Sequence, residues 1–332
     1  MRRTDKPTIT DVAQHAKVSI ATVSRVINNK NCVKESTERK VYEAIETLGF
    51  ELPGPKTIEN PSKVILVCVP EFNSLFCAPI LDGVQAAAEA KGYDFLALQI
   101  KQHNASNKDI DSTLSTLPFA GIIFLASLKN KEYLSNLSRK YPMVLCAAES
   151  DIMPCVCIDN YQASLKAVKY ILSTGREKVG LINYNLDYSY ARERERGYCD
   201  ALAEKSIEIN PNWITHISTQ DFRLAYSSAM YMLKQKNRPD AIFAVSDAYA
   251  ISSISAAQQL GLSVPHDVSV LGFDNISLAS IVNPALTTVS QPAFQMGYQS
   301  FELLFEKIIN PEIRNKKVVL ETELVLRAST II

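Results

Sequence analysis

The chain has 332 residues, of which 47% are apolar, so it is long enough to bury the cores of two or three domains. Basic and acidic residues balance overall, but residues 1–40 carry nine Lys and Arg against four Asp and Glu, which leaves the remainder acidic. A basic start on an acidic body suits binding of a phosphate polyanion at one end only. No stretch resembles a signal peptide or a membrane span, which excludes secreted and membrane-spanning classes and predicts a cytoplasmic protein.

The first fifty residues predict three short helices. Apolar spacing over residues 8–16 indicates a helix capped by Thr10, and a turn follows over residues 17–19. Ser19 is expected to cap a second helix over residues 20–28, and a third helix is expected over residues 36–48. Two short helices joined by a tight turn are typical of a helix-turn-helix, whose second helix enters the major groove of DNA.

The segment that follows, residues 51–63, has three Pro and one Gly, which disfavours a regular helix. We expect a flexible tether here, one that tolerates variable spacing between DNA half-sites.

From residue 64 onward, strand-like and helix-like patterns alternate. The strand-like stretches are residues 64–69, 93–100, 121–125, 143–147, 156–159, 178–182, 214–217, 241–245 and 268–273. Continuous apolar strands alternating with helices predict buried parallel sheets, and their number suggests two doubly wound subdomains. A ligand would then bind at the carboxyl ends of the strands, in the cleft between the subdomains.

Sequence motifs for catalysis and metal binding are missing. No two of the eleven glycines are separated by a single residue, which excludes a Gly-x-Gly dinucleotide loop, and the P-loop and Gly-x-Ser-x-Gly patterns are also absent. The four histidines are scattered, and Cys155 and Cys157 lack zinc-knuckle spacing. We expect a protein that is not an enzyme and has no cofactor and no metal, with its seven cysteines reduced and mostly buried.

The string from Ala16 to Asn28, together with residues 10–13 and 41–50, closely resembles the head of the LacI/GalR family of transcriptional repressors. Within that family, the turn and the weak hinge are most similar to the cytidine-repressor type. The resemblance implies DNA contacts from eight residues: Thr10, Ser19, Ile20, Ala21, Thr22, Ser24, Arg25 and Asn28. Two of these residues, Ile20 and Ala21, match the family's base-reading pair.

Three positions depart from the family pattern. Lys17 stands where the family usually has Gly, so a positive φ at that turn would cost about 1 kcal/mol. Lys34 replaces the Ser that usually caps the third helix, and Pro53 replaces the Asn of the hinge helix. The minor-groove wedge of that hinge is therefore not expected here.

The resemblance extends over nearly the whole body, with matching strings at residues 157–160, 268–275 and 284–291 among others. It implies an all-α head plus an α/β body of two doubly wound parallel-sheet subdomains, of periplasmic-binding-protein type I. The expected boundaries are residues 7–52 for the head, 53–63 for the linker, 64–160 with 291–322 for one subdomain, and 161–290 with 323–332 for the other.

Effector contacts carried over from the family, or from positions that vary with the effector, give eleven candidates: Leu75, Phe76, Ser127, Asp159, Tyr188, Tyr190, Arg194, Phe222, Asp247, Asp274 and Gln291. Carboxylates, an Arg fork and an aromatic face together suit a polyol or a nucleoside. For any single Asp at a strand end, capping of the next helix is an equally good interpretation.

We therefore expect a homodimeric repressor that binds a pseudo-palindromic DNA operator and whose affinity is controlled by a nucleoside or sugar effector. Two other classes stay open at this point. A solute-binding receptor of periplasmic-binding-protein type would explain the body but not the head or the missing signal peptide, and an enzyme of doubly wound fold is disfavoured by the missing motifs.

Overall fold

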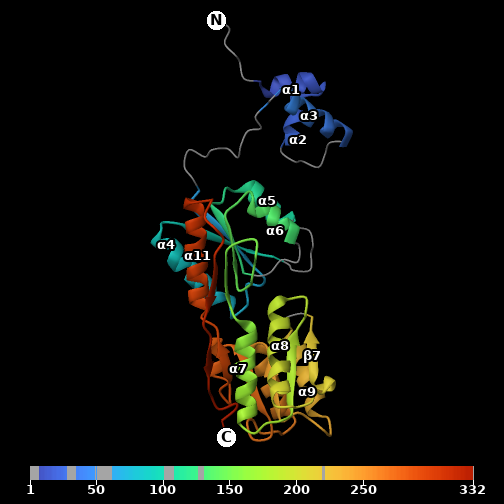
Figure 1. The fold of residues 1–332 in the computed structure, drawn as a ribbon, viewed down its shortest axis with the longest axis vertical. Coiled ribbons are helices and arrows are strands. Elements are labelled where there is room, and N and C mark those ends of the chain that lie inside the picture. Colours follow the sequence, from blue (N-terminus) through green and yellow to red (C-terminus); the bar gives the residue numbers. More distant parts are fainter. Residues whose placement is uncertain are drawn as a thin grey trace. The chain divides into compact units, whose positions relative to one another are not determined.

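The computed structural model describes residues 7–27, 35–48, 50, 62–100, 108–125, 131–218 and 221–331. The chain divides into two compact units, a head over residues 1–61 and a body over residues 62–332 (Figure 1). The tether predicted over residues 51–63 lies outside the described residues, except for its last two positions. The head and the body are described in turn.

The head is a three-helix unit of α1 (Ile9–Ala16), α2 (Ile20–Ile27) and α3 (Glu35–Leu48). Apolar side chains from all three helices form one core: Val12, Ala13, Ala16, Val23, Val26, Val41, Ala44 and Ile45. These are residues that helical spacing placed on inward faces, so the predicted three-helix head is confirmed.

The cap of α1 differs from the prediction. Thr8, not Thr10, is the N-cap, and it forms a capping box with Asp11. The Thr8 backbone N–H donates to Asp11 Oδ2 at 2.7 Å, and the Asp11 N–H donates to Thr8 Oγ1 at 3.4 Å. The Thr8 hydroxyl also donates to Asp11 Oδ2 at 2.6 Å, and this bond, together with the one from the Thr8 N–H, lowers the pKa of Asp11. The capping box satisfies two end groups at once, which Thr10 could not do from inside the first turn.

The turn between α1 and α2 has a positive φ at Lys17, the position where the sequence departs from the usual glycine. Lys17 has a φ of 55° and is the left-handed C-cap of α1. The Val18 N–H then donates to the Ala13 carbonyl oxygen at 3.0 Å and closes the turn. A left-handed residue at this point is the common way to end a helix, and glycine is the usual choice for it.

The first subdomain of the body is a parallel sheet with the strand order β11-β5-β4-β3-β1-β2. Its strands are β1 (Val64–Val69), β2 (Asp94–Gln99), β3 (Gly121–Phe124), β4 (Met143–Cys146), β5 (Cys155–Ile158) and β11 (Lys317–Leu320). Its helices are α4 (Cys77–Ala90), α5 (Lys108–Thr116), α6 (Lys131–Ser138) and α11 (Ala293–Ile309).

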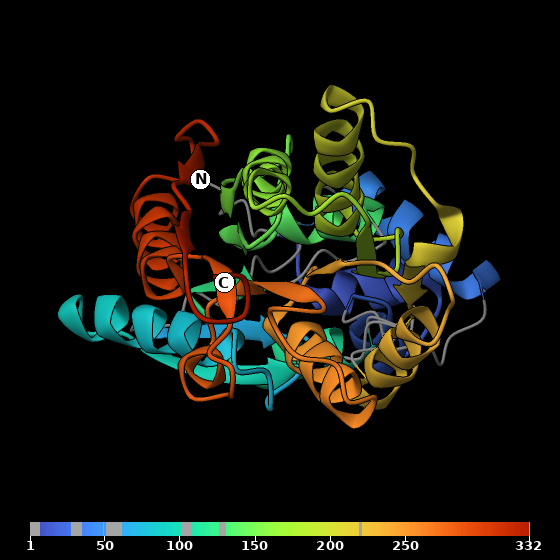
Figure 2. The same cartoon turned by 90° about the horizontal axis from the view of Figure 1, so that it is seen from below.

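The second subdomain has the strand order β12-β10-β9-β8-β6-β7, and only the edge strand β12 is antiparallel. Its strands are β6 (Val179–Tyr184), β7 (Ile214–Ile217), β8 (Ala241–Ala244), β9 (Ser269–Asp274), β10 (Thr287–Ser290) and β12 (Glu323–Val325). Its helices are α7 (Asn160–Ser173), α8 (Ser189–Glu204), α9 (Phe222–Leu233) and α10 (Asp247–Gln259), with short 3-10 helices η1 (Pro211–Trp213) and η2 (Ser277–Ser280). The pair α7 and α8 covers one face of this sheet, and α9 and α10 cover the other (Figure 2).

Three segments connect the subdomains. The chain leaves the first sheet after β5 to enter α7, returns between β10 and α11, and crosses once more between β11 and β12. Residues at these crossings lie between two sheets whose strands end at the same cleft. A ligand that touches the crossings therefore touches the segments on which any relative movement of the subdomains depends.

Close packing of α4 against α11 fixes one wall of that cleft. A side chain on Gly297 would lie 1.9 Å from the Ile80 carbonyl oxygen, and one on Gly83 would lie 2.0 Å from the Phe294 carbonyl oxygen. Only glycine allows the two helix backbones to approach this closely. The packing holds the start of α4 beside the start of α11.

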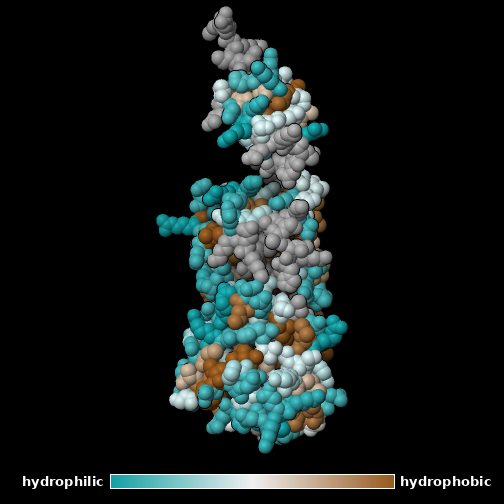
Figure 3. Space-filling model, turned by 90° about the vertical axis from the view of Figure 1, so that its right-hand side faces the viewer, coloured by the Kyte–Doolittle hydropathy of each residue, from teal (hydrophilic) through white to brown (hydrophobic). Residues whose placement is uncertain are grey.

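The predicted fold class is confirmed. All nine predicted strands correspond to β1–β9, with ends that agree within two residues. Six cysteines in the described residues are free thiols, five of them buried. The surface in Figure 3 is largely hydrophilic on the body, with scattered apolar side chains. Among the helices that the structure describes, none combines the length and apolar composition needed to cross a bilayer.

Candidate functional site

The outward face of α2 is the candidate DNA-binding surface of the head. Ser19 caps the helix as predicted, since the Thr22 N–H donates to Ser19 Oγ at 3.0 Å and the two hydroxyls lie 2.8 Å apart. Val23 and Val26 face the core, so Ile20, Ala21 and Arg25 face solvent, with Ile20 48% exposed. An exposed isoleucine at the start of a short capped helix is available for apolar contact with a base edge.

The remaining candidates of the head are distributed around this surface. Thr10 is exposed on α1, and Thr22 and Ser24 are half-buried on α2. Asn28 lies outside the described residues. Lys17 adds an exposed charge beside the turn. The arrangement is a short helix with its N-terminal half accessible, flanked by hydroxyls and cations, which is the combination that major-groove recognition needs.

A cavity of about 260 Å³ lies in the cleft between the two subdomains of the body. Its walls come from the ends of several strands and the starts of the following helices in both sheets. Eight of the eleven effector candidates line it: Leu75, Phe76, Tyr188, Tyr190, Arg194, Phe222, Asp274 and Gln291. The cavity is apolar and aromatic over most of its surface, as small-molecule sites generally are.

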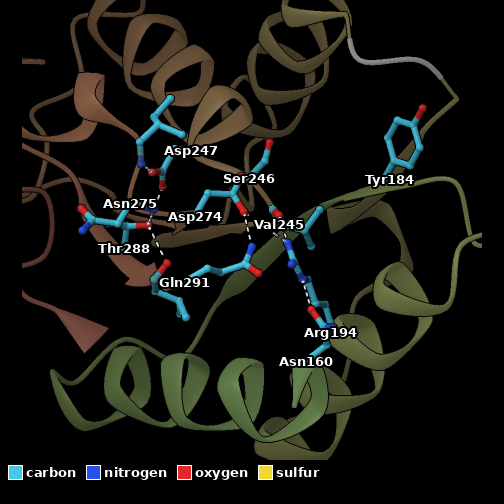
Figure 4. A network of polar contacts seen from close by, with 12 residues as sticks. Asn160, Tyr184, Arg194, Val245, Ser246, Asp247, Asp274, Asn275, Thr288 and Gln291 are labelled. Atoms are coloured by element: carbon cyan, nitrogen blue, oxygen red, sulfur yellow. Dashed lines mark hydrogen bonds and ion pairs between the residues drawn. The ribbon is translucent and has the colours of Figure 1, made fainter. Parts of the chain in front are cut away.

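Arg194 is the central polar group of the cavity (Figure 4). It projects from α8, is 5% exposed, and stacks its guanidinium 3.5 Å from the Phe273 ring centroid. Its Nε donates to Asn160 Oδ1 at 2.8 Å, and its Nη1 donates to the Val245 carbonyl oxygen. The bonds tie α8 to the first crossing and to the end of β8.

One edge of the Arg194 guanidinium is left for a ligand. Nη2 makes no hydrogen bond with any residue that the structure describes. Burial lowers the pKa of Arg194, although the carboxylate of Asp274, 3.9 Å from Nη1, acts in the opposite direction. The group remains a cation in the pH range of the cell, because an arginine pKa begins so high.

Asp274 lies opposite Arg194, at the carboxyl end of β9. Its Oδ1 accepts a hydrogen bond from Gln291 Nε2 at 2.7 Å, while Oδ2 has no hydrogen-bond partner in the described part of the chain. Burial raises the pKa of Asp274, and Arg194 and Gln291 partly offset that rise. Asp274 and the next residue, Asn275, both have positive φ, at 114° and 56°, a conformation that L side chains adopt only when the surroundings hold them.

The loop after β9 is held in this conformation by side chains outside the cavity. Asp247 Oδ2 accepts the Ile276 N–H at 2.8 Å, and Oδ1 accepts the hydroxyl of Thr288. Arg327 Nη2 donates to Asn275 Oδ1 at 2.8 Å. Asp247, at the start of α10, and Arg327, which follows β12, thereby position Asp274; Figure 4 shows the Asp247 part of this network.

The geometry corrects the interpretation of Asp247. It was expected to accept hydroxyl protons of an effector, but it is fully buried, it does not line the cavity, and both of its oxygens bind the chain itself. Burial and the nearby charge of Asp274 raise the pKa of Asp247 to about 8. Asp247 therefore supports the site rather than contacting a ligand.

Asp159 is also not part of the cavity wall. It is the N-cap of α7, and its Oδ1 accepts the Gln162 N–H at 2.9 Å. The helix-capping alternative holds for this residue. Ser127 lies outside the described residues.

Sequence reasoning missed several cavity residues. Tyr184, Tyr249, Asn160 and Glu71 all line the cavity. Each of them follows the end of a strand by a few residues or ends that strand itself, which is the position that parallel sheets give to ligand-binding groups. That rule alone could have identified Asn160 and Glu71.

The tyrosines form a cluster at one end of the cavity. The ring centroids of Tyr184 and Tyr188 lie 5.1 Å apart, those of Tyr188 and Tyr190 5.7 Å, and those of Tyr184 and Tyr190 6.2 Å, the last pair stacked. Burial raises the pKa of Tyr184, Tyr190 and Tyr249, so these phenols stay neutral at physiological pH.

A second hollow of about 450 Å³ lies next to the first, between the start of α4 and the start of α11. The two hollows share five lining residues: Leu75, Phe76, Asp274, Ile276 and Gln291. Asp274 and Gln291 thus stand between the two spaces. In the residues that the structure describes, no cluster of three or more His, Cys, Asp or Glu side chains is arranged to hold a metal ion.

Comparison with known proteins assigns both units. Residues 8–51 match the family model described as bacterial regulatory proteins, lacI family, and residues 168–330 match that of a periplasmic binding protein-like domain. The HTH-type transcriptional repressor PurR of Photobacterium profundum is 32% identical over 333 residues, covering 97% of this chain and 98% of the relative. The chain belongs to the LacI family.

Another member of the LacI family, the repressor CytR of Escherichia coli, is 31% identical over 329 residues and covers 97% of this chain and 96% of its own length. The resemblance inferred from the sequence is confirmed, and the CytR and PurR types are about equally similar to this chain.

Solved structures agree with this assignment. A complex of the transcriptional regulator CelR with cellobiose has a TM-score of 0.74 at 27% identity, and the match covers 97% of this chain and 99% of that one. An uncharacterized protein from Actinobacillus succinogenes has a TM-score of 0.75 at 32% identity, covering 81% of this chain and 100% of that chain. The relatives whose names state a function are transcription regulators, not enzymes.

Proposed function

We propose that this LacI-family chain is a transcriptional repressor whose affinity for a DNA operator is set by a small molecule bound in the cleft of its body. The observation that carries the proposal is Arg194. This buried side chain joins the crossing residue Asn160, the end of β8 and Asp274, yet leaves one nitrogen for a ligand. A ligand bound to that nitrogen would contact the Arg194 guanidinium, which connects the two subdomains of the body.

The head supplies sequence recognition. Ile20, Ala21 and Arg25 would contact base edges, because they occupy the exposed face of α2. Thr10, Ser19, Thr22, Ser24 and Asn28 would contact phosphates or neighbouring base edges, as short polar side chains at the ends of a recognition helix commonly do.

The effector is proposed to carry adjacent hydroxyl groups, as a sugar or the ribose of a nucleoside does. Arg194 Nη2 offers a donor, and Oδ2 of Asp274, whose Oδ1 lies 3.9 Å from Arg194 Nη1, offers an acceptor nearby. A diol can donate to the carboxylate and accept from the guanidinium at once. The rings of Phe76, Tyr190 and Phe222 would lie against the body of the ligand.

The positions of the cavity residues suggest how ligand binding would change the affinity for DNA. Asn160 and Gln291 occupy two of the three crossings, and both line the cavity. Closing the cleft around a ligand changes how the subdomains are arranged, and a typical allosteric coupling of this kind is about 1–3 kcal/mol. We propose a homodimer in which two heads bind the two halves of a pseudo-palindromic operator, each reinforcing the other.

Selection of bound DNA from a pool of random duplexes tests the proposal. The full chain should enrich a sequence with two-fold symmetry, and Arg25→Ala should lose that enrichment while remaining folded by circular dichroism. The alternative, a solute-binding receptor without a role in transcription, predicts no enriched sequence at any salt concentration.

A further inference from the structure

We propose that the effector carries a positively charged nitrogen, and that this group sits at the tyrosine end of the cavity, against Tyr184, Tyr188 and Tyr249 and beside Glu71. The inference deepens the proposed function, because it concerns the chemical class of the ligand for the same cleft. It rests on that function only for the regulatory consequence, since binding itself can be measured without DNA.

The charge of the cavity favours a cation. Among the residues that the structure describes, three charged side chains line it, namely Glu71, Arg194 and Asp274. Arg194 and Asp274 face each other at 3.9 Å and largely compensate one another. Glu71 has no ion-pair partner among the residues that the structure describes. A ligand with one positive charge therefore neutralises the cavity, whereas a phosphorylated ligand adds repulsion to a site that is already acidic.

Glu71 lies close enough to the tyrosine cluster to affect its electrostatics. It lies on the segment between β1 and α4, and its charge is one of the causes that raise the pKa of both Tyr184 and Tyr249. Figure 4 shows Tyr184 apart from the network around Arg194 and Asp274, with no bond drawn to that network. The Glu71 carboxylate therefore interacts electrostatically with the tyrosines at this end of the cavity.

The rings supply what a carboxylate alone does not. Tyr184, Tyr188 and Tyr190 have their ring centroids 5.1–6.2 Å from each other and all three line the cavity, so the packed rings present a continuous aromatic surface to a ligand. Neutral phenol rings attract a cation through the negative potential over their faces. Within the same cavity, the Arg194 guanidinium already lies 5.2 Å from the Tyr190 ring centroid.

Two ends of different chemistry therefore define the ligand class. One end bears hydroxyl groups for Arg194, Asp274 and Gln291, and the other bears an ammonium or a similarly charged nitrogen. Amino sugars and hydroxylated amines have this combination, and simple neutral hexoses do not.

A matched pair of probes separates charge from shape. Choline has a quaternary ammonium and a hydroxyl, and 3,3-dimethylbutan-1-ol has nearly the same shape with carbon in place of the charged nitrogen. Titration calorimetry on the full chain without DNA should give choline a dissociation constant lower by about tenfold, within the range that cation–π contacts and one nearby carboxylate provide.

Variants assign the preference to this end of the cavity. Glu71→Gln and Tyr184→Leu should each reduce the preference for choline several-fold, while Tyr184→Phe, which keeps the ring, should retain it. Glu89→Gln removes the same charge from an exposed position on α4 and should leave the preference unchanged. Thermal melting of each variant establishes that it is folded.

Equal affinity for the two probes in the unmodified chain would overturn the proposal, and so would a lack of choline binding in the millimolar range. A preference that survives both Glu71→Gln and Tyr184→Leu would also overturn it, because the charge would then be recognised elsewhere. None of these results bears on the selection of operator DNA, so failure of this inference is distinguishable from failure of the proposed function.

Discussion

Replacing Asp247 tests whether its buried hydrogen bonds stabilise the loop that carries Asp274. Asp247→Ala leaves the Ile276 N–H and the Thr288 hydroxyl without their acceptor in a fully buried place. Each unsatisfied buried group costs about 1–3 kcal/mol, so with two such groups the second subdomain should lose roughly 2–6 kcal/mol of stability. Asp247→Asn keeps the shape and one acceptor, and near pH 5.5 it should stay at least as stable as the unmodified chain.

The dependence on pH has a definite sign. The pKa of Asp247 is about 8 in the folded chain against an ordinary value of 3.8, so the folded state binds the proton more tightly than the unfolded state. The stability that this proton confers is complete below about pH 4 and is lost as the pH rises towards 8. As the pH rises, the free energy of unfolding of the unmodified chain should therefore decrease relative to that of Asp247→Asn. The decrease should be up to about 1.4 kcal/mol per pH unit, or on the order of 3 kcal/mol between pH 5.5 and 8.5.

Urea unfolding followed by tryptophan fluorescence gives the measurement. Trp213 is the single tryptophan of the chain, lies buried in the same subdomain, and donates from Nε1 to the Asn237 carbonyl oxygen at 3.1 Å. Asp221→Asn, at a half-buried carboxylate whose pKa Arg223 lowers, is the control and should not alter the slope in this pH range. The reasoning is refuted if Asp247→Ala costs nothing, or if Asp247→Asn leaves the pH slope of the unmodified chain intact.

Three further variants probe the other parts of the account. Arg25→Ala should weaken operator binding by about tenfold or more in a fluorescence anisotropy titration, because it removes a contact worth about 1–3 kcal/mol of base discrimination. Arg194→Met should abolish the response to effector while changing effector-free operator binding by less than about twofold, and Arg196→Met, on an exposed turn of the same helix, should keep the response. Thr8→Ala should destabilise the head by about 1 kcal/mol in thermal melting, since it removes a capping box, whereas Thr10→Ala should have little effect on stability; equal effects of the two would contradict the assignment of the cap.

The strands β1–β9 were predictable because each is a short apolar run between helical patterns, and most of them are buried on both faces. The strands β10, β11 and β12 were not predicted as strands. Thr287–Ser290 is rich in hydroxyls that bond to other segments, and Lys317–Leu320 is an edge strand with alternating exposure. Both are strands because of their neighbours in the sheet, which no local pattern records.

The candidate site was predictable where a side chain type and its place at a strand end agreed, as for Asp274 and Gln291. Asp159 and Asp247 occupy equivalent places in the sequence but face the chain, and only three-dimensional packing distinguishes a capping or bracing carboxylate from one that faces a ligand. The Tyr184 and Tyr249 rings were missed for the converse reason, because a tyrosine near a strand end has no pattern that separates a cavity wall from a core.

The central claim is that occupancy of the cleft sets the affinity of the head for DNA. Its most direct test is the dissociation constant of the full chain for its selected operator, measured without and with a saturating ligand that calorimetry has shown to bind the body. The account predicts a change of about 5- to 150-fold, in either direction, that disappears in Arg194→Met. An operator affinity that stays the same while the cleft fills would contradict it.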